Sequence, residues 1–149
     1  MKRLIIVFFM LSIVPTLAAA DDVDNVKRSV QSLYDALNDG DADTVAKYFL
    51  SEASQFSRTG QRLTPFFTGT HQLKTQFDTG LKYKVKIRNL DAKVYGDSAV
   101  ATCYTTGFTA YPDRTVLEGT FRVSAMWIKH ANQWKIAHGH ISRLQSTIE

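Results

Sequence analysis

The sequence of 149 residues contains 18 lysines and arginines against 14 aspartates and glutamates, which gives a formal net charge of +4. This length predicts a single domain, and so small a charge excludes the broad basic surface that a nucleic-acid-binding protein needs. The only cysteine, Cys103, cannot form a disulfide within the chain, so the apolar core must hold the fold together. Its apolar neighbours predict a buried thiol rather than a nucleophile.

The first twenty residues have the layout of a secretory signal peptide. Two basic residues precede an apolar run that ends at Val14, and three alanines lead up to Asp21. The run is too short to cross a bilayer as a stable helix, although an uncleaved membrane anchor is the alternative interpretation. We expect removal of residues 1–20 and a periplasmic or secreted mature domain over 21–149, with no integral membrane segment after cleavage.

Two helices are predicted at the start of the mature chain. Apolar residues recur at steps of three and four from Val23 to Leu37, which is typical of an amphipathic helix, and Gly40 ends it. Asp41 or Asp43 can then cap a second, shorter helix. We therefore expect a helix, a tight turn and another helix.

The following segment is rich in serine, threonine, glycine and phenylalanine. It predicts a short strand over 55–58 and a loop that contains Pro65. A third short helix is predicted from His71, and Gly80 ends it.

From Leu81 the apolar pattern changes to a period of two, which predicts strands. Over 81–88 the apolar side chains alternate with three lysines and one arginine, so one face of this strand meets water. Turns at Gly96-Asp97 and 131–133 then join pairs of strands into hairpins.

The order of these elements, with helices first and hairpin strands afterwards, predicts an α+β fold. Gly107 and Gly119 fall within strands, where glycine often marks a bulge or bend. We therefore expect a cone-shaped curved antiparallel sheet wrapped over the N-terminal helices. Its apolar interior is the default place for a ligand.

The stretch WKIAHGHISRL near the C-terminus places His138, His140 and Ser142 at every second position. On an extended strand, these side chains share one face with Trp134 and Ile136. We expect the three polar side chains to form a polar end of the cone.

Three roles are open to the two histidines of this stretch. Imidazoles on alternate strand positions can ligate a metal ion, but the spacing specifies no third ligand, so we expect neither a metal nor a cofactor. Imidazole titrates near neutral pH and suits acid–base catalysis if a substrate lies within hydrogen-bond reach. The favoured interpretation is structural, with imidazoles hydrogen-bonded to neighbouring hydroxyl groups. Ser142 lacks the local motif of an activated nucleophile.

Three stretches carry a resemblance to a known family: ALNDGDADTVAKYF, GTFRVSAMW and the terminal NQWKIAHGHIS. They resemble the SnoaL-like branch of the nuclear transport factor 2-like superfamily, and the ending is also similar to the association domain of calcium/calmodulin-dependent kinases. The resemblance implies a curved antiparallel sheet on helices, usually dimeric, with a pocket in the cone. Members include isomerases, cyclases, dehydratases, lyases, transport factors and oligomerisation modules, so the fold alone assigns no activity.

Two enzyme types of this superfamily can be compared with the sequence. The ketosteroid-isomerase type needs an inward acidic base, but the strand acids Asp91 and Glu118 fall at expected strand ends. Iota-class carbonic anhydrases end in H-H-H-S-S. His138, His140 and Ser142 match the first, third and fifth positions of that signature, whereas the second and fourth positions differ.

The candidate pocket residues are aromatic and polar side chains expected around the cone. Arg122 can face either the pocket, where it would pair with a carboxylate ligand, or the outer face of the sheet. The ligand-binding candidates are Tyr34, Tyr48, Phe56, Tyr104, Thr106, Arg122, Trp127, His138 and His140, and the catalytic candidates are His138, His140 and Ser142.

Two functions remain as hypotheses from the sequence. The first is an exported SnoaL-like domain, homodimeric through its outer sheet face, that binds a small molecule or partner in the cone without catalysis. The alternative is a small-molecule lyase or isomerase that uses His138 and His140, with iota-type carbonic anhydrase as its narrowest form.

Overall fold

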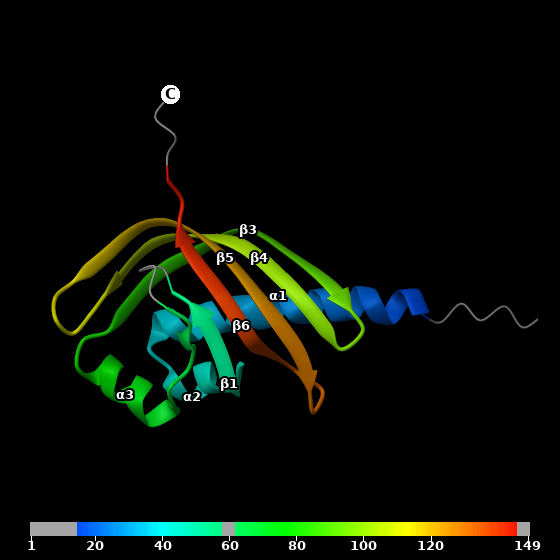
Figure 1. Ribbon diagram of the computed structural model, residues 1–149, viewed down its shortest axis with the longest axis horizontal. Coiled ribbons are helices and arrows are strands. Elements are labelled where there is room, and N and C mark those ends of the chain that lie inside the picture. Colours follow the sequence, from blue (N-terminus) through cyan, green and yellow to red (C-terminus); the bar gives the residue numbers. More distant parts are fainter. Residues whose placement is uncertain (1–14, 58–61, 146–149) are drawn as a thin grey trace, which may run out of the picture.

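The computed structural model describes residues 15–57 and 62–145 (Figure 1). Residues 1–14, which make up most of the predicted signal peptide, lie outside the described residues, and 15–20 belong to the first helix. Within the described ranges, no helix is both long and apolar enough to cross a membrane. Cleavage of residues 1–20 therefore stays a prediction.

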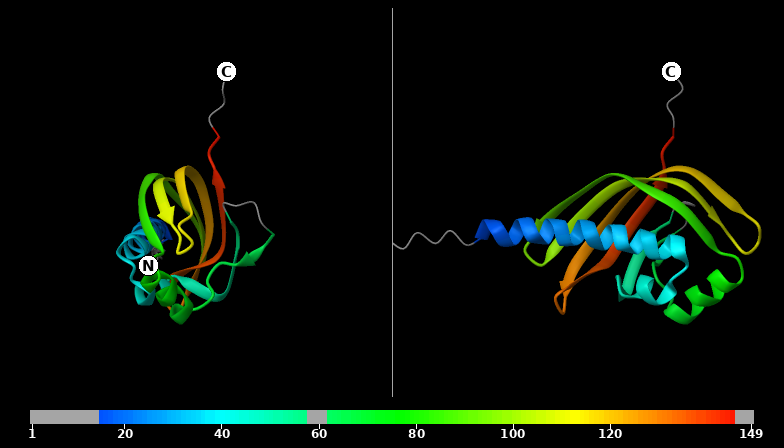
Figure 2. Two further views of the ribbon diagram at one scale, coloured as in Figure 1. Left: turned by 90° about the vertical axis from the view of Figure 1, so that its left-hand side faces the viewer. Right: turned by 180° about the vertical axis from the view of Figure 1, so that it is seen from behind.

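A curved sheet wraps over helices, as the predicted α+β cone requires (Figures 1 and 2). The helices are α1 (Pro15–Asp39), α2 (Ala42–Ala46) and α3 (Thr70–Asp78). The strands are β1 (Phe49–Phe56), β2 (Thr64–Pro65), β3 (Lys82–Tyr95), β4 (Ser98–Ala110), β5 (Val116–His130) and β6 (Gln133–Arg143). They form one sheet in the order β2-β1-β6-β5-β4-β3. Helix α1 lies along its concave side (Figure 2).

The sheet is antiparallel except at one pair of strands. Neighbours from β3 to β6 pair antiparallel, and β3–β4 and β5–β6 are the predicted hairpins. Strand β1, however, runs parallel to β6, so the predicted antiparallel sheet contains one parallel pair. It also begins at Phe49, earlier than the predicted strand over 55–58. The reason is tertiary: Phe49 and Ala53 pack towards the core, which extends the strand.

The helix boundaries follow the predicted stop and cap signals. Helix α1 ends at Asp39, and Gly40 follows with φ 73°, a conformation that glycine adopts without strain. The carboxylate of Asp41 accepts a hydrogen bond from the Thr44 backbone N–H at 3.0 Å and caps α2. Helix α3 ends just before Gly80, as predicted.

The core lies between α1 and the concave side of the sheet. Val26, Val30 and Leu33 recur at three- and four-residue steps, and all three are buried. They belong to one cluster with Trp127 of β5 and Ile136 of β6, which are 1% and 2% exposed. Because each such side chain contributes about 1.5–3 kcal/mol when buried, this stripe docks the helix onto the sheet.

A side-chain amide fastens the end of α1 to the edge strand β3. Asn38 donates to the Val85 carbonyl at 2.8 Å and accepts from the Val85 N–H at 2.9 Å. These backbone groups lie at an edge of the sheet, where a further strand would otherwise pair with them. The amide therefore occupies the edge at Val85 and fastens the C-terminal end of α1 to β3.

The bend of the sheet centres on the two strand glycines. Gly107 and Gly119 are direct cross-strand partners, with φ 131° and 142°. A Cβ atom on Gly107 would clash with the carbonyl of Lys84, so glycine is required there. Both strand glycines thus have the irregular backbone that was predicted, and the sheet as a whole arches over α1 (Figure 2).

Candidate functional site

A cavity of about 580 Å³ fills the inside of the cone. Its deep part is lined by apolar side chains of the helices and the sheet, such as Val30, Leu33, Ala125 and Ile136. Exposed polar residues such as Gln76 complete its described wall. The cavity therefore suits a ligand with a mostly apolar body.

Phenylalanines close one side of this cavity. The Phe49 ring meets Phe66 edge-on, with centroids 5.0 Å apart, and stacks on Phe67 at 5.4 Å. The Phe66 N–H donates to the Ala53 carbonyl at 2.7 Å, and its ring occupies the space that a side chain at Gly139 would need. The segment after β2 is thereby fixed to the cavity wall. The phenylalanine pair in the stretch TPFFTGT is the sequence signal for this wall, but no local pattern places it at the cavity.

Cys103 lines the cavity as a buried thiol, as the sequence predicts. Burial disfavours the thiolate and raises the pKa of this group to about 11. The thiol is therefore neutral at ordinary pH and a weak nucleophile.

The described cavity wall contains one carboxylate, Asp113. It is exposed in the β4–β5 loop, and a hydrogen bond from the Thr115 backbone N–H at 2.8 Å lowers the pKa of this carboxyl. The acids Asp91 and Glu118 lie on strands, are exposed and do not line the cavity. Among the residues that the structure describes, no cluster of three histidine, cysteine or acidic side chains could hold a metal ion.

A bulge in β6 overturns the predicted face of the two histidines. Trp127 pairs with Ile136, but the preceding residue Met126 pairs with His138, so Ala137 has no partner of its own. The extra residue reverses the alternation of side chains that follow it.

The bulge decides which side chains of the C-terminal part of β6 face the cavity. Ile141 lines the cavity together with Ile136, whereas His138, His140 and Ser142 lie on the outer face of the sheet. The expectation that these three polar side chains share a face with Trp134 and Ile136 is therefore wrong.

The outer face holds the histidines beside β1. Nδ1 of His138 lies 2.9 Å from the Ser54 hydroxyl in a hydrogen bond, in keeping with the structural role favoured from the sequence. The Phe56 ring meets His138 and His140 edge-on, with centroids 5.6 and 6.0 Å apart. His140 is exposed.

The other candidates divide between the two sides of the sheet. Tyr34 and Trp127 line the cavity, as expected. Tyr48 packs edge-on against Trp127 but does not line the cavity. Three further candidates lie on the outer face, so a place for them in the pocket wall is wrong: Phe56, Tyr104 and Thr106. The sequence left open which face of the sheet carries Arg122. Its side chain is exposed on the outer face, between Tyr104 and Ser142.

The family model of the SnoaL-like domain matches residues 26–146, so the chain belongs to this family and the predicted resemblance is confirmed. No curated protein matches the sequence.

Solved structures of this fold are similar to the chain. An NTF2-like protein from Cytophaga hutchinsonii has a TM-score of 0.69 at 15% identity, covering 81% of this chain and 97% of its own. A ketosteroid isomerase-like protein from Erwinia carotovora atroseptica has a TM-score of 0.63 at 15% identity, covering 85% and 98%. The association domain of CaMKII from C. elegans has a TM-score of 0.64 at 20% identity, covering 84% and 98%. These likenesses define the fold.

We expect burial of Cys103 to make the protein less stable at alkaline pH. The folded thiol keeps its proton up to a pKa of about 11, whereas an unfolded thiol loses it above about pH 8.5. Unfolding then releases a proton, so the free energy of unfolding falls as the pH rises through this window. Urea unfolding measures this effect. Between about pH 8 and about pH 10.5, the free energy of unfolding of wild type should fall by about 2 kcal/mol more than that of Cys103→Ala. Equal losses would contradict the raised pKa.

Proposed function

We propose that the protein is an exported SnoaL-like domain that binds a small, largely apolar molecule in the cone without catalysis. The main support for ligand binding is the cavity of about 580 Å³, which is lined mainly by apolar and aromatic side chains. Pockets of this size and character take small organic molecules. The signal-like layout of residues 1–20 supports export.

The chemistry of the described wall supports binding rather than turnover. Proton transfer needs an acid or base within hydrogen-bond reach of the substrate. Asp113 is exposed at the rim, Cys103 keeps its proton, and the two histidines lie on the outer face. The tyrosine hydroxyls of the wall suit the orientation of a polar group on the ligand.

A homodimer through the outer sheet face is part of the same proposal. Exposed large apolar side chains lie there on β1, β4 and β5: Phe56, Val100, Tyr104, Phe108, Val116 and Met126. Single exposed apolar residues are ordinary, but several on one face, with Val100 directly opposite Met126, favour a surface that meets a partner. One structural neighbour is an association domain, that of CaMKII from C. elegans, which is in keeping with this role for the fold.

We expect apolar ligands to enter the cone. The neutral dye N-phenyl-1-naphthylamine should bind with saturable fluorescence, and Ala101→Leu should weaken binding about tenfold because Ala101 lines the cavity. Thr102→Leu is the matched control, since Thr102 is exposed on the opposite face. Equal affinity of both variants would place the dye elsewhere and contradict the cone cavity as the ligand site.

We expect no catalysis from the histidine pair. The alternative function, a lyase or isomerase of the iota carbonic anhydrase kind, would have to act on the outer face, where His138 and His140 lie. Stopped-flow assays of CO2 hydration should give the rate of buffer alone for wild type. A faster rate that is lost in His138→Ala and His140→Ala, with the free energy of unfolding unchanged, would establish the alternative.

We expect the exported chain to have lost residues 1–20 and to be a dimer in native mass spectrometry. Met126→Lys should give monomers, because it places a cation within the apolar set of the outer face. Gln31→Lys adds the same charge on the exposed side of α1, and this variant should remain dimeric. An uncleaved chain would contradict export, and a monomeric wild type would contradict the dimer.

A further inference from the structure

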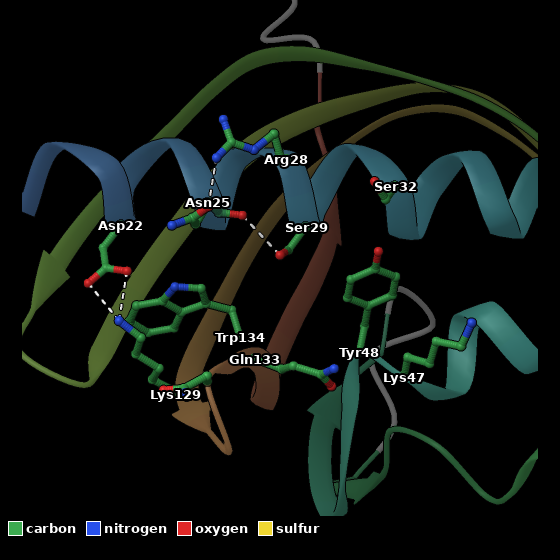
Figure 3. A pocket seen from close by; sticks show the side chains of 11 residues that line it. Asp22, Asn25, Arg28, Ser29, Ser32, Lys47, Tyr48, Lys129, Gln133 and Trp134 are labelled. Atoms are coloured by element: carbon green, nitrogen blue, oxygen red, sulfur yellow. Dashed lines mark hydrogen bonds and ion pairs between the residues drawn. The ribbon is translucent and has the colours of Figure 1, made fainter. Parts of the chain in front are cut away.

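A second hollow, the α1 groove, lies outside the cone between α1 and the β5–β6 turn (Figure 3). Its volume is about 570 Å³, and its third wall is the junction of α2 and β1 at Lys47 and Tyr48. The Tyr48 ring meets Trp127 edge-on, with centroids 6.5 Å apart. Because Trp127 lines the cone and Tyr48 lines the groove, these two rings stand between the hollows.

The α1 groove has an excess of positive charge. Arg28, Lys47 and Lys129 line it together with one acid, Asp22, so three cations less one anion leave two positive charges. Nζ of Lys129 donates to both carboxylate oxygens of Asp22 at 2.9 and 3.0 Å, and this hydrogen bonding lowers the pKa of Asp22. The carboxylate is therefore already engaged. Arg28 donates to the Asn25 amide oxygen at 2.6 Å, which neutralises no charge.

Several hydrogen-bond donors line the groove besides its cations. The hydroxyls of Ser32 and Tyr48 face each other across it (Figure 3). The indole N–H of Trp134, a residue only 5% exposed, has no hydrogen-bond partner and points towards α1 (Figure 3). A buried donor without an acceptor costs stability. The groove thus offers charge and donors to a ligand that supplies oxygen acceptors.

We propose that the α1 groove binds a small oxyanion, namely the carboxylate or phosphate group of an organic molecule. Charge-assisted hydrogen bonds from lysine and arginine to such oxygens are stronger than neutral ones. Among the described residues, Arg28 and Lys47 form no ion pair, so both cations of the groove wall are available to such an anion while Lys129 stays paired with Asp22.

The indole N–H signals of the 15N-labelled protein test this proposal, because the chain has two tryptophans, one lining each hollow. Inorganic phosphate and citrate are titrated separately at constant ionic strength, with sodium chloride as the reference. We expect a saturable shift of the Trp134 signal with phosphate, citrate or both, while the Trp127 signal stays in place. Trp127→Phe assigns the two signals. A shift with only one probe identifies the preferred anion and supports the site.

Matched variants localise the anion. Lys47→Met and Tyr48→Phe should each weaken binding, Lys47→Met by about tenfold. Lys86→Met removes the same charge from the exposed face of β3 and should leave the affinity unchanged. No saturable shift, an equal response to sodium chloride, or equal weakening by Lys86→Met would overturn the proposal. Binding of the apolar dye to the cone is measured separately, through Ala101→Leu. A failure to bind anions in the α1 groove is therefore distinguishable from a failure to bind apolar ligands in the cone.

Discussion

The extra residue Ala137 in β6 decides which side chains of the last strand reach the inside of the cone. Before it, Trp134 and Ile136 are buried; after it, Ile141 lines the cavity. If the strand alternated without interruption, both imidazoles would enter the cavity and bring polar atoms that need partners. The bulge instead keeps this part of the wall apolar, and the glycine at 139 leaves room for the Phe66 ring. The non-catalytic character that we propose for the cone rests on this one register shift.

The same cavity depends on how the sheet is bent and held. The glycine pair in β4 and β5 lets the strands arch, while Asn38 fastens α1 to the edge strand at Val85. The bend creates the concavity, and the apolar stripe of α1 fills part of it without closing it. A cavity therefore remains where a flatter sheet would pack directly onto the helix.

The molecule presents three surfaces of different chemistry on one small fold. The cone is apolar with a protonated thiol in its wall, the α1 groove is cationic and rich in donors, and the outer sheet face combines exposed apolar side chains with the two histidines. Because the fold family hosts many activities, only these local chemistries bear on function. They favour recognition of ligands and partners over acid–base catalysis inside the cone.

The sequence by itself determined that three helices precede the strands, where the first and third helices end, the cap of α2, the hairpins and the curved α+β sheet, because periodicity and turn residues act over a few neighbouring positions. It also identified the family and the buried state of Cys103. Tertiary structure alone decided the parallel pairing of β1 with β6 and the sides of the sheet on which His138 and Arg122 lie. A bulge barely changes local propensity, yet it reverses every later side chain in its strand. Its position is selected by packing between segments far apart in the chain, which no local pattern records.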